Sequence, residues 1–283
     1  MPKNARKIGL WGENQYFYQK TKAMTQITFY KYQGTGNDFV MIDDRSLTFP
    51  AHQSVIARLC DRRFGVGGDG LILLQNTPNY DFKMVYFNAD GRQGSMCGNG
   101  GRATVRFAAD LGLITDSTTF VAVDGEHKAV ACEDEIFLKM GAVSLLEQYA
   151  DYDFMDTGSP HYVTFVENID AVDVLASGRA VRYGPQFEPR GGTNVNFVQM
   201  IDQNTLYVRT YERGVEDETF SCGTGVTACA LAAHLRFGTV EPVQVLTKGG
   251  NLRVSFQTRA DGGFENIYLI GPAVRVFKGE IWV

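Results

Sequence analysis

Two cysteines of the chain each stand directly before a glycine-rich segment. Cys97 opens the sequence CGNGG, and Cys222 opens the sequence CGTG. A cysteine just before a helix lies at the positive end of the helix dipole, which favours the thiolate and lowers the thiol pKa. Glycines at that point leave backbone N–H groups free to bind an anion that approaches closely. Each segment therefore predicts a reactive sulfur beside a carboxylate site.

Two such segments that faced each other would form a proton-transfer site. The helix N-termini would hold a substrate carboxylate and stabilise the charge that develops on the neighbouring α-carbon. One thiolate would remove the α-proton from one face, and the opposing thiol would protonate the other face. The predicted chemistry is inversion of an α-carbon, and it requires no cofactor.

Cofactor motifs are also missing from the sequence. The segment GTGNDF does not fit the dinucleotide fingerprint, and the sequence contains no P-loop. There is no Cys-x-x-Cys pair and the four histidines are scattered, so we predict no metal site and no nicotinamide or pyridoxal phosphate.

Composition limits the class of protein. The chain has 283 residues, 44% of them hydrophobic, and a net charge of −5, which allows one or two domains and favours neither nucleic acid nor an anionic membrane as partner. It has no apolar run of membrane-spanning length and no signal-peptide core, so a cytoplasmic protein is expected. Residues 1–23 carry five Lys/Arg against one Glu and are expected to be a disordered extension.

Four landmarks recur in the second half of the chain at offsets of 122 to 125 residues. The pairs are Thr35-Gly36 with Thr157-Gly158, Asn88 with Glu212, Cys97 with Cys222, and Asp124-Gly125 with Lys248-Gly249. The apolar runs after the two cysteines predict buried helices that end before Gly112 and Gly238, with strands before and after each. The repeat predicts two α/β units with pseudo-two-fold symmetry and a ligand site in the cleft between them.

Taken in order, the motifs resemble those of a known family. They are GTGNDFVMID (34–43), RFGVGGDGLILL (63–74), YFNADGRQGSMCGNGGR (86–102), GSPHYV (158–163), GTNVNFVQ (192–199) and YERGVEDETFSCGTG (211–225). From about Met24 to the C-terminus, the chain is similar to the diaminopimelate epimerases, which belong to the proline racemase-like superfamily. The resemblance implies a mixed α/β (α+β) fold of two barrel-like sheets, each around a central helix. The halves would be residues 24–143 plus 272–283, and residues 144–271.

The resemblance also implies an activity and a homodimer. The activity would be interconversion of LL- and meso-2,6-diaminopimelate, a zwitterionic amino acid of lysine and peptidoglycan precursor synthesis. Cys97 would donate and Cys222 accept the proton in the LL-to-meso direction, with His161 and Glu212 tuning the thiols. The implied substrate-binding residues are Asn37, Asn88, Gly98, Asn99, Ser159, Asn194, Glu212, Arg213, Gly223 and Thr224. Ser159 stands where many family members have Asn, so that contact is the least certain of the set.

Three alternatives remain open at the level of sequence. A proline or hydroxyproline epimerase of the same superfamily is disfavoured by Asn99 and Ser221, where such enzymes have His and Asp. A cysteine hydrolase using Cys222 and His161 would leave Cys97 unexplained, and a non-catalytic binding module would require neither thiol. The other cysteines, Cys60, Cys132 and Cys229, are expected to be small buried packing residues.

Overall fold

A computed structural model describes residues 25–144 and 146–283, so the extension predicted at 1–23 lies outside the described residues. The first half contains β1 (Gln26–Gly34), β2 (Asn37–Asp43), α1 (Gln53–Cys60), β3 (Gly70–Gln75), β4 (Lys83–Asn88), α2 (Gly98–Asp110), β5 (Ser117–Ala122), β6 (Gly125–Cys132) and β7 (Glu135–Lys139). The second half contains β8 (Leu146–Gln148), β9 (Asp153–Asp156), β10 (Pro160–Phe165), α3 (Val174–Arg182), β11 (Asn194–Met200), β12 (Thr205–Glu212), β13 (Asp217–Thr219), α4 (Gly223–Phe237), β14 (Val243–Thr247), β15 (Gly250–Thr258) and β16 (Phe264–Pro272). The chain closes with β17 (Val274–Trp282), and two 3-10 turns lie at Ile169–Ala171 and Glu188–Arg190.

The two halves repeat one order of strand pairing. In the first half β1–β2 is antiparallel, β2–β3 parallel, β3–β4 antiparallel and β4–β5 parallel, and β5, β6 and β7 follow as an antiparallel meander. In the second half β9, β10, β11, β12, β14, β15 and β16 pair with the same alternation of directions. In each half one short helix follows the second of these strands and one long helix follows the fourth. The predicted mixed fold with an internal repeat is confirmed.

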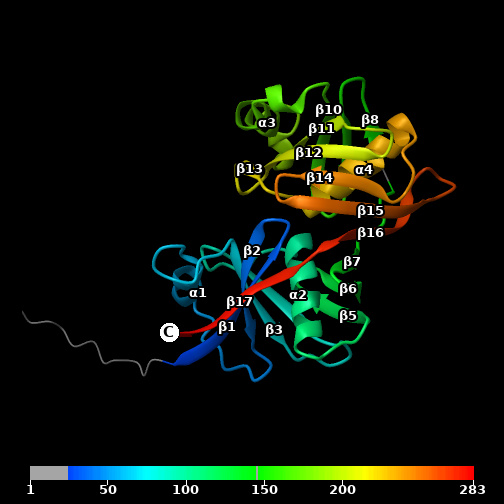
Figure 1. The fold of residues 1–283 in the computed structure, drawn as a ribbon. Coiled ribbons are helices and arrows are strands. Elements are labelled where there is room, and N and C mark those ends of the chain that lie inside the picture. Colours follow the sequence, from blue (N-terminus) through cyan, green and yellow to red (C-terminus); the bar gives the residue numbers. More distant parts are fainter. Residues whose placement is uncertain (1–24, 145) are drawn as a thin grey trace, which may run out of the picture.

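Two strand pairings connect the halves. β7 and β16 pair antiparallel, so that the strands form one continuous sheet. β17 then runs back from the second half and pairs with β1 along its length (Figure 1). The division of the chain at residues 143 and 272 stays a prediction, and it is compatible with this pairing.

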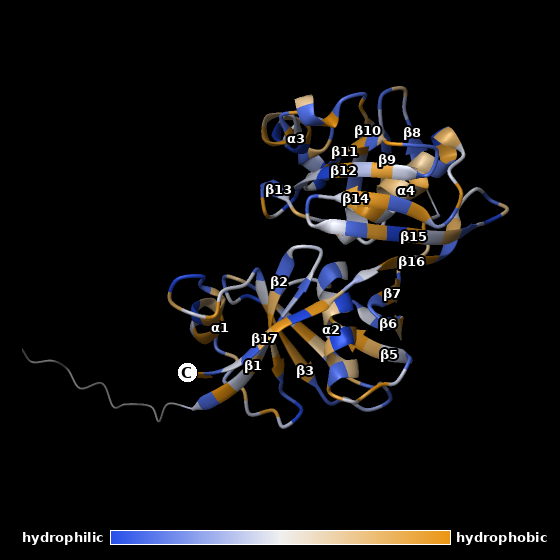
Figure 2. Ribbon diagram, in the orientation of Figure 1, coloured by the Kyte–Doolittle hydropathy of each residue, from blue (hydrophilic) through white to orange (hydrophobic). Residues whose placement is uncertain are grey.

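Each half surrounds its long helix with apolar side chains. α4 is buried on all sides from Gly225 to Ala233, which is the pattern of a helix inside a core. It packs with apolar residues of β10, β12 and β14–β16, while α2 packs with those of β1–β7. In Figure 2, β3 and β14 are drawn largely in the hydrophobic colour. Among the described residues, no helix is long and apolar enough to span a membrane.

The helix ends follow the predicted signals, whereas other features depart from expectation. α4 ends at Gly238, which adopts the left-handed conformation with φ +70°. The sequence patterns did not predict α3, whose start is capped by the Asp173 carboxylate. Cys60 and Cys229 are buried as expected, but the expectation for Cys132 is wrong, because its side chain points to the solvent face of β6.

The enclosure of α4 generates a test of the core. Replacement of Leu231, which is fully buried, by alanine should lower the free energy of unfolding by about 2 to 5 kcal/mol, because it removes apolar contacts and leaves a cavity. Leu235 in the same helix is 39% exposed, so the same replacement there should cost less than about 1 kcal/mol. Denaturant titration of both variants measures the difference. Equal losses would contradict the enclosed position of α4.

Candidate active site

The two cysteines are the N-caps of the two long helices. Cys97 and Cys222 have extended backbones, and α2 and α4 begin at the next residues, Gly98 and Gly223. The carbonyl of each cysteine accepts the first helical hydrogen bond, from the N–H of Gly101 at 2.7 Å and from the N–H of Val226 at 2.8 Å. The predicted position of both thiols at helix starts is therefore present.

The two helix N-termini meet each other. A Cβ atom built on Gly223 would lie 3.6 Å from the Cα of Gly98, and only 2.8 Å from the Leu269 side chain on β16. Asn99 of α2 donates a hydrogen bond of 2.8 Å from its amide to the carbonyl of Ser221, just before α4. The glycines are thus required twice, for free N–H groups and for the close approach of the helices.

A second contact joins the halves beside this junction. The turn at Thr35-Gly36, between β1 and β2, packs on the turn between β14 and β15. A Cβ on Gly249 would lie 1.8 Å from the carbonyl oxygen of Thr35, so no larger residue fits there without a backbone shift. The segment before Cys222 is held as well, because the Gly249 N–H donates to the carbonyl of Phe220 at 3.0 Å.

Burial raises the pKa of both thiols, and this corrects the sequence-based expectation. For Cys97 and Cys222, loss of hydration is the largest cause, and the Glu212 carboxylate adds to it. Backbone N–H groups at the helix starts act in the opposite direction, as does the Thr224 hydroxyl beside Cys222, but they do not outweigh desolvation. The prediction of a lowered pKa from the helix dipole is wrong for the free protein.

Asn37 and Asn99 lie beside Cys97. The Cys97 thiol donates to Oδ1 of Asn37 at 3.6 Å, and Asn99 donates to the same oxygen at 3.4 Å. The other end of the Asn37 amide donates to the Asp69 carboxylate at 2.7 Å. Arg62 in turn donates to Asp69 at 2.8 Å. A polar chain from Arg62, just after α1, to the sulfur therefore determines how Asn37 presents its oxygen.

His161 and Thr224 lie beside Cys222. The Nε2 of His161 is 2.9 Å from Oγ1 of Thr224, and that oxygen is 3.5 Å from the Cys222 sulfur. His161 is completely buried, and burial together with the nearby Arg213 charge lowers its pKa to about 3. The imidazole is therefore neutral at physiological pH.

Glu212 at the end of β12 acts on both sulfurs. It raises the pKa of Cys97 and of Cys222, so it is close enough to interact with each. Its own pKa is raised by burial, although the Thr219 hydroxyl donates to it at 2.8 Å. A carboxylate near both thiols can accept a thiol proton or a hydrogen bond from a substrate ammonium group.

Ser159, Asn194 and Arg213 form a cluster on the second half. Asn194 donates to the Ser159 hydroxyl at 2.8 Å, and the Arg213 guanidinium donates to the same oxygen at 3.3 Å. The backbone N–H of Arg213 donates to Oδ1 of Asn194 at 2.9 Å. Ser159 is therefore hydrogen-bonded to two of the other expected binding residues.

Asn88 is the one expected binding residue that these contacts do not include. It lies exposed at the end of β4, opposite Gly70. Within residues 25–144 and 146–283, no hydrogen bond connects its side chain to the rest of the set. Its part in substrate binding stays a prediction.

Sequence reasoning missed several polar residues that position the expected ones. Arg102 is fully buried and donates to Oδ1 of Asn99 at 3.0 Å and to the Thr35 hydroxyl at 3.2 Å, which orients the Asn99 amide. Asn196 donates to the ring of His161 at 3.1 Å. The periods of helix and strand could have identified both residues from the sequence. Arg102 lies about one helical turn after Asn99, and Asn196 lies on the same strand face as Asn194.

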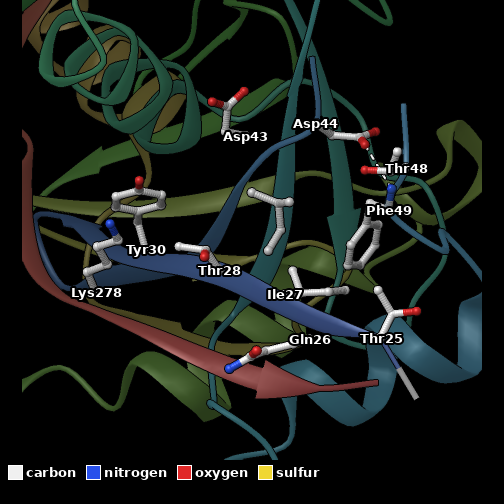
Figure 3. A pocket seen from close by; sticks show the side chains of 11 residues that line it. Thr25, Gln26, Ile27, Thr28, Tyr30, Asp43, Asp44, Thr48, Phe49 and Lys278 are labelled. Atoms are coloured by element: carbon white, nitrogen blue, oxygen red, sulfur yellow. Dashed lines mark hydrogen bonds between the residues drawn. The ribbon is translucent and has the colours of Figure 1, made fainter. Parts of the chain in front are cut away.

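A groove elsewhere on the molecule is a different feature. It is lined by β1, β2 and residues near Phe49, with Lys278 at one end (Figure 3). Neither cysteine lines it, so it is not part of the candidate active site.

The buried imidazole predicts a pH dependence of stability. Because the pKa of His161 is about 3 in the native state against 6.5 for a free histidine, acid protonates the unfolded chain first. From pH 6.5 down to about 3, this group alone should therefore remove about 1.4 kcal/mol of stability per pH unit. Unfolding titrations of wild type and His161→Gln across this range test it. If the difference between the two proteins does not change with pH, His161 is not held neutral.

The junction of the two helix N-termini predicts a redox behaviour. Mild oxidation should inactivate the protein by joining Cys97 to Cys222, and reductant should restore it, because the helix starts that follow the two cysteines touch each other and Cys97 contributes to the raised pKa of Cys222. Mass spectrometry of oxidised peptides identifies the bond. Finding only free thiols in oxidised, inactive protein would contradict the prediction, and buried Cys229 serves as an internal control.

Comparison with known proteins identifies the family. The profile described as Diaminopimelate epimerase matches residues 29–146 and 154–276, once in each half. The chain is 49% identical over 255 residues to the diaminopimelate epimerase of Flavobacterium psychrophilum, covering 89% of this chain and 99% of that protein. It is 40% identical to the diaminopimelate epimerase of Aquifex aeolicus, covering 89% and 97%.

Solved structures show the same fold in more distant proteins. A phenazine biosynthesis protein of the PhzF family from Bacillus anthracis superposes with a TM-score of 0.72 at 15% identity, covering 92% of this chain and all of that chain. A hydroxyproline epimerase from Agrobacterium vitis superposes with a TM-score of 0.64 at 14% identity, covering 91% and 93%. These likenesses concern the fold, whereas the profile and the relatives above show that this chain belongs to the diaminopimelate epimerase family.

Proposed function

We propose that the protein interconverts LL- and meso-2,6-diaminopimelate by proton transfer between two cysteines. The observation that carries the proposal is the junction of α2 and α4, where Cys97 and Cys222 cap helix N-termini that touch each other. Family membership supports the same conclusion. The proposed enzyme works without a cofactor, as a cytoplasmic homodimer in lysine and peptidoglycan precursor synthesis, with no nucleic acid or membrane partner.

The substrate carboxylate is proposed to bind at the helix junction. The N–H groups of Gly98, Asn99, Gly223 and Thr224 belong to the first turns, where a helix leaves its N–H groups without intrahelical acceptors. They stabilise the negative charge that moves onto the carboxylate when the α-proton leaves.

Proton transfer then uses the two sulfurs in turn. In the LL-to-meso direction the Cys222 thiolate takes the α-proton, and the electron pair of the broken C–H bond moves into the carboxylate as an enediolate. The Cys97 thiol donates its proton to the opposite face, which forms the new C–H bond and leaves a thiolate on Cys97. The reverse reaction exchanges the roles, so every proton is accounted for.

A zwitterionic substrate also suits the electrostatics of the site. Both thiols have raised pKa values in the free protein, and a neighbouring cation favours the thiolate. The ammonium group of an amino acid supplies such a charge and has Glu212 as an acceptor. Arg213, with Ser159 and Asn194, offers donors to the distal carboxylate. Asn37 and Asn88 would bind the remaining polar groups.

Single cysteine replacements distinguish this function from the alternatives. Cys97→Ser and Cys222→Ser should each lower kcat by about 10²- to 10⁴-fold, because each removes one partner of the acid–base pair. Cys60→Ser and Cys229→Ser are the matched controls. A hydrolase would lose activity only with Cys222, and a binding module would not depend on either thiol.

The direct test of substrate is isotope exchange. Reduced protein is incubated with LL-diaminopimelate in D2O, and the product is analysed by proton NMR and chiral separation. We expect the meso isomer with deuterium at one α-carbon. Turnover of proline or 4-hydroxyproline instead would overturn the substrate assignment, and no exchange with any of the three would overturn the two-thiol mechanism.

A further inference from the structure

The turn that carries Arg213 has little packing of its own. It spans residues 213–216 and connects β12 to β13. Val215 is 57% exposed, and a Cβ atom built on Gly214 would meet no atom within 4 Å. Exposed turns without packed side chains belong to the most mobile parts of a protein. A guanidinium on this turn therefore needs another support if it is to point in one direction.

The Glu216 carboxylate supplies a support from within the turn. Its Oε1 accepts from the backbone N–H of Gly214 at 3.0 Å, and its Oε2 accepts from the Tyr211 hydroxyl at 3.0 Å. Loss of hydration acts against the charged form, but the hydrogen bonds to the carboxylate and the Arg182 charge outweigh it, so the pKa of Glu216 is lowered. The carboxylate is therefore ionised at physiological pH, and it ties the turn to β12.

The backbone of Glu216 adopts a conformation that disfavours a side chain. Its φ is +61°, in the left-handed region where glycine is the residue without a steric penalty. Strained residues persist where the surrounding structure holds them, and they gather at functional sites. Glycine would adopt this turn freely, but it would lack the carboxylate. The contacts of that carboxylate are therefore what compensates for the strain.

Arg182, the last residue of α3, extends the support to a helix. Its guanidinium donates to Oε1 of Glu216 at 3.3 Å, and its side chain is only 14% exposed. It fills the space beside Gly192, where a Cβ atom would lie 1.5 Å from its Nη1. α3 itself packs against β11, β12 and β13 (Figure 1), and it comes close to Tyr211 because Gly178 has no side chain. The helix that the sequence patterns did not predict thus supports the turn.

The Arg213 guanidinium has few contacts of its own. Among the described residues, its one side-chain hydrogen bond goes to the Ser159 hydroxyl at 3.3 Å. Its backbone N–H is fixed more firmly, by Oδ1 of Asn194 at 2.9 Å. A guanidinium has five N–H donors, so donors remain for the carboxylate of a ligand. The direction of these donors depends on where the turn places the backbone.

We propose that Arg182 and Glu216 are positioning residues that act through the turn at 213–216 to aim the Arg213 guanidinium at the distal carboxylate of the substrate. Because the turn is held before substrate binds, less conformational freedom is lost on binding. The inference rests on the proposed function, since a substrate with a second carboxylate is what requires this guanidinium. It predicts an effect on substrate binding and none on proton transfer at the sulfurs.

Steady-state kinetics with LL-diaminopimelate is the first test. Glu216→Gly removes the carboxylate and relieves the backbone strain, so the variant should fold. We expect KM to rise about tenfold, the effect of losing hydrogen bonds to a charged group, and kcat to change by less than about twofold. Glu216→Gln keeps an acceptor oxygen for the turn, and its KM should stay within about threefold of wild type.

Glu133→Gly is the matched control. Glu133 also has a positive φ, +42°, and lies in the exposed turn between β6 and β7. The same replacement there relieves the same kind of strain away from the site, so KM should stay at the wild-type value. An unchanged KM in Glu216→Gly, or an equal rise in Glu133→Gly, would overturn the proposal.

NMR of the arginine side chains gives a readout that needs no turnover. Relaxation of the ¹⁵Nε–H signals reports motion on the picosecond to nanosecond timescale, and Arg213→Lys assigns the signal of Arg213. We expect a restrained Arg213 in wild type and in Glu133→Gly, and a mobile one in Glu216→Gly. Equal mobility in all three proteins would overturn the proposed positioning. If Arg213 becomes mobile as expected but wild type does not epimerise diaminopimelate, the proposed function alone is refuted.

Discussion

The contact between the N-termini of α2 and α4 is the constraint on which the rest of the site depends. Two helix N-termini that meet bring the positive ends of two helix dipoles together, so they repel each other, and each helix start leaves N–H groups without an intrahelical partner. The contact forms because Gly98 and Gly223 have no side chains and because Leu269 covers both. The bond from Asn99 to the Ser221 carbonyl then ties one half to the other. An anion bound at this point would relieve the repulsion, which is why the junction suits a carboxylate.

Enclosure of the thiols has a cost that the surrounding polar groups partly offset. Burial disfavours thiolates, and Glu212 disfavours them further, so the free protein holds two neutral thiols more readily than two charged ones. Backbone N–H groups at the helix starts and the Thr224 hydroxyl beside Cys222 offset part of this effect. A water-excluded site of this kind strengthens each hydrogen bond that remains, provided its partners are in place.

The repeated topology explains how one chain builds two half-sites of matching geometry. In both halves the long helix follows the fourth strand of the same pairing order, so each half delivers a cysteine, a helix start and a preceding strand end. The halves have nevertheless diverged in their polar residues. Asn88 ends the fourth strand in one and Glu212 ends it in the other, so the surroundings of the two thiols are not symmetric.

Local signals in the sequence were sufficient to predict most of the elements that position the candidate site. Glycines after each cysteine, apolar runs and a left-handed C-terminal glycine predicted both long helices, because capping and periodicity act over a few residues. The register of the repeat predicted two similar halves. The sequence patterns predicted neither α3 nor the exposure of Cys132, since a short amphipathic segment and a lone cysteine carry little local signal.

Only the tertiary structure determined the thiol pKa shifts and the hydrogen-bond partners of the site residues. The bonds from Asn99 to Ser221 and from His161 to Thr224 join residues 122 and 63 positions apart, so no local pattern reveals them. Burial likewise depends on the whole fold, and it reversed the lowered thiol pKa that the helix starts alone would predict. The sequence by itself determined which groups are the candidates for the chemistry. Packing and desolvation determined how those groups are held and how readily they ionise.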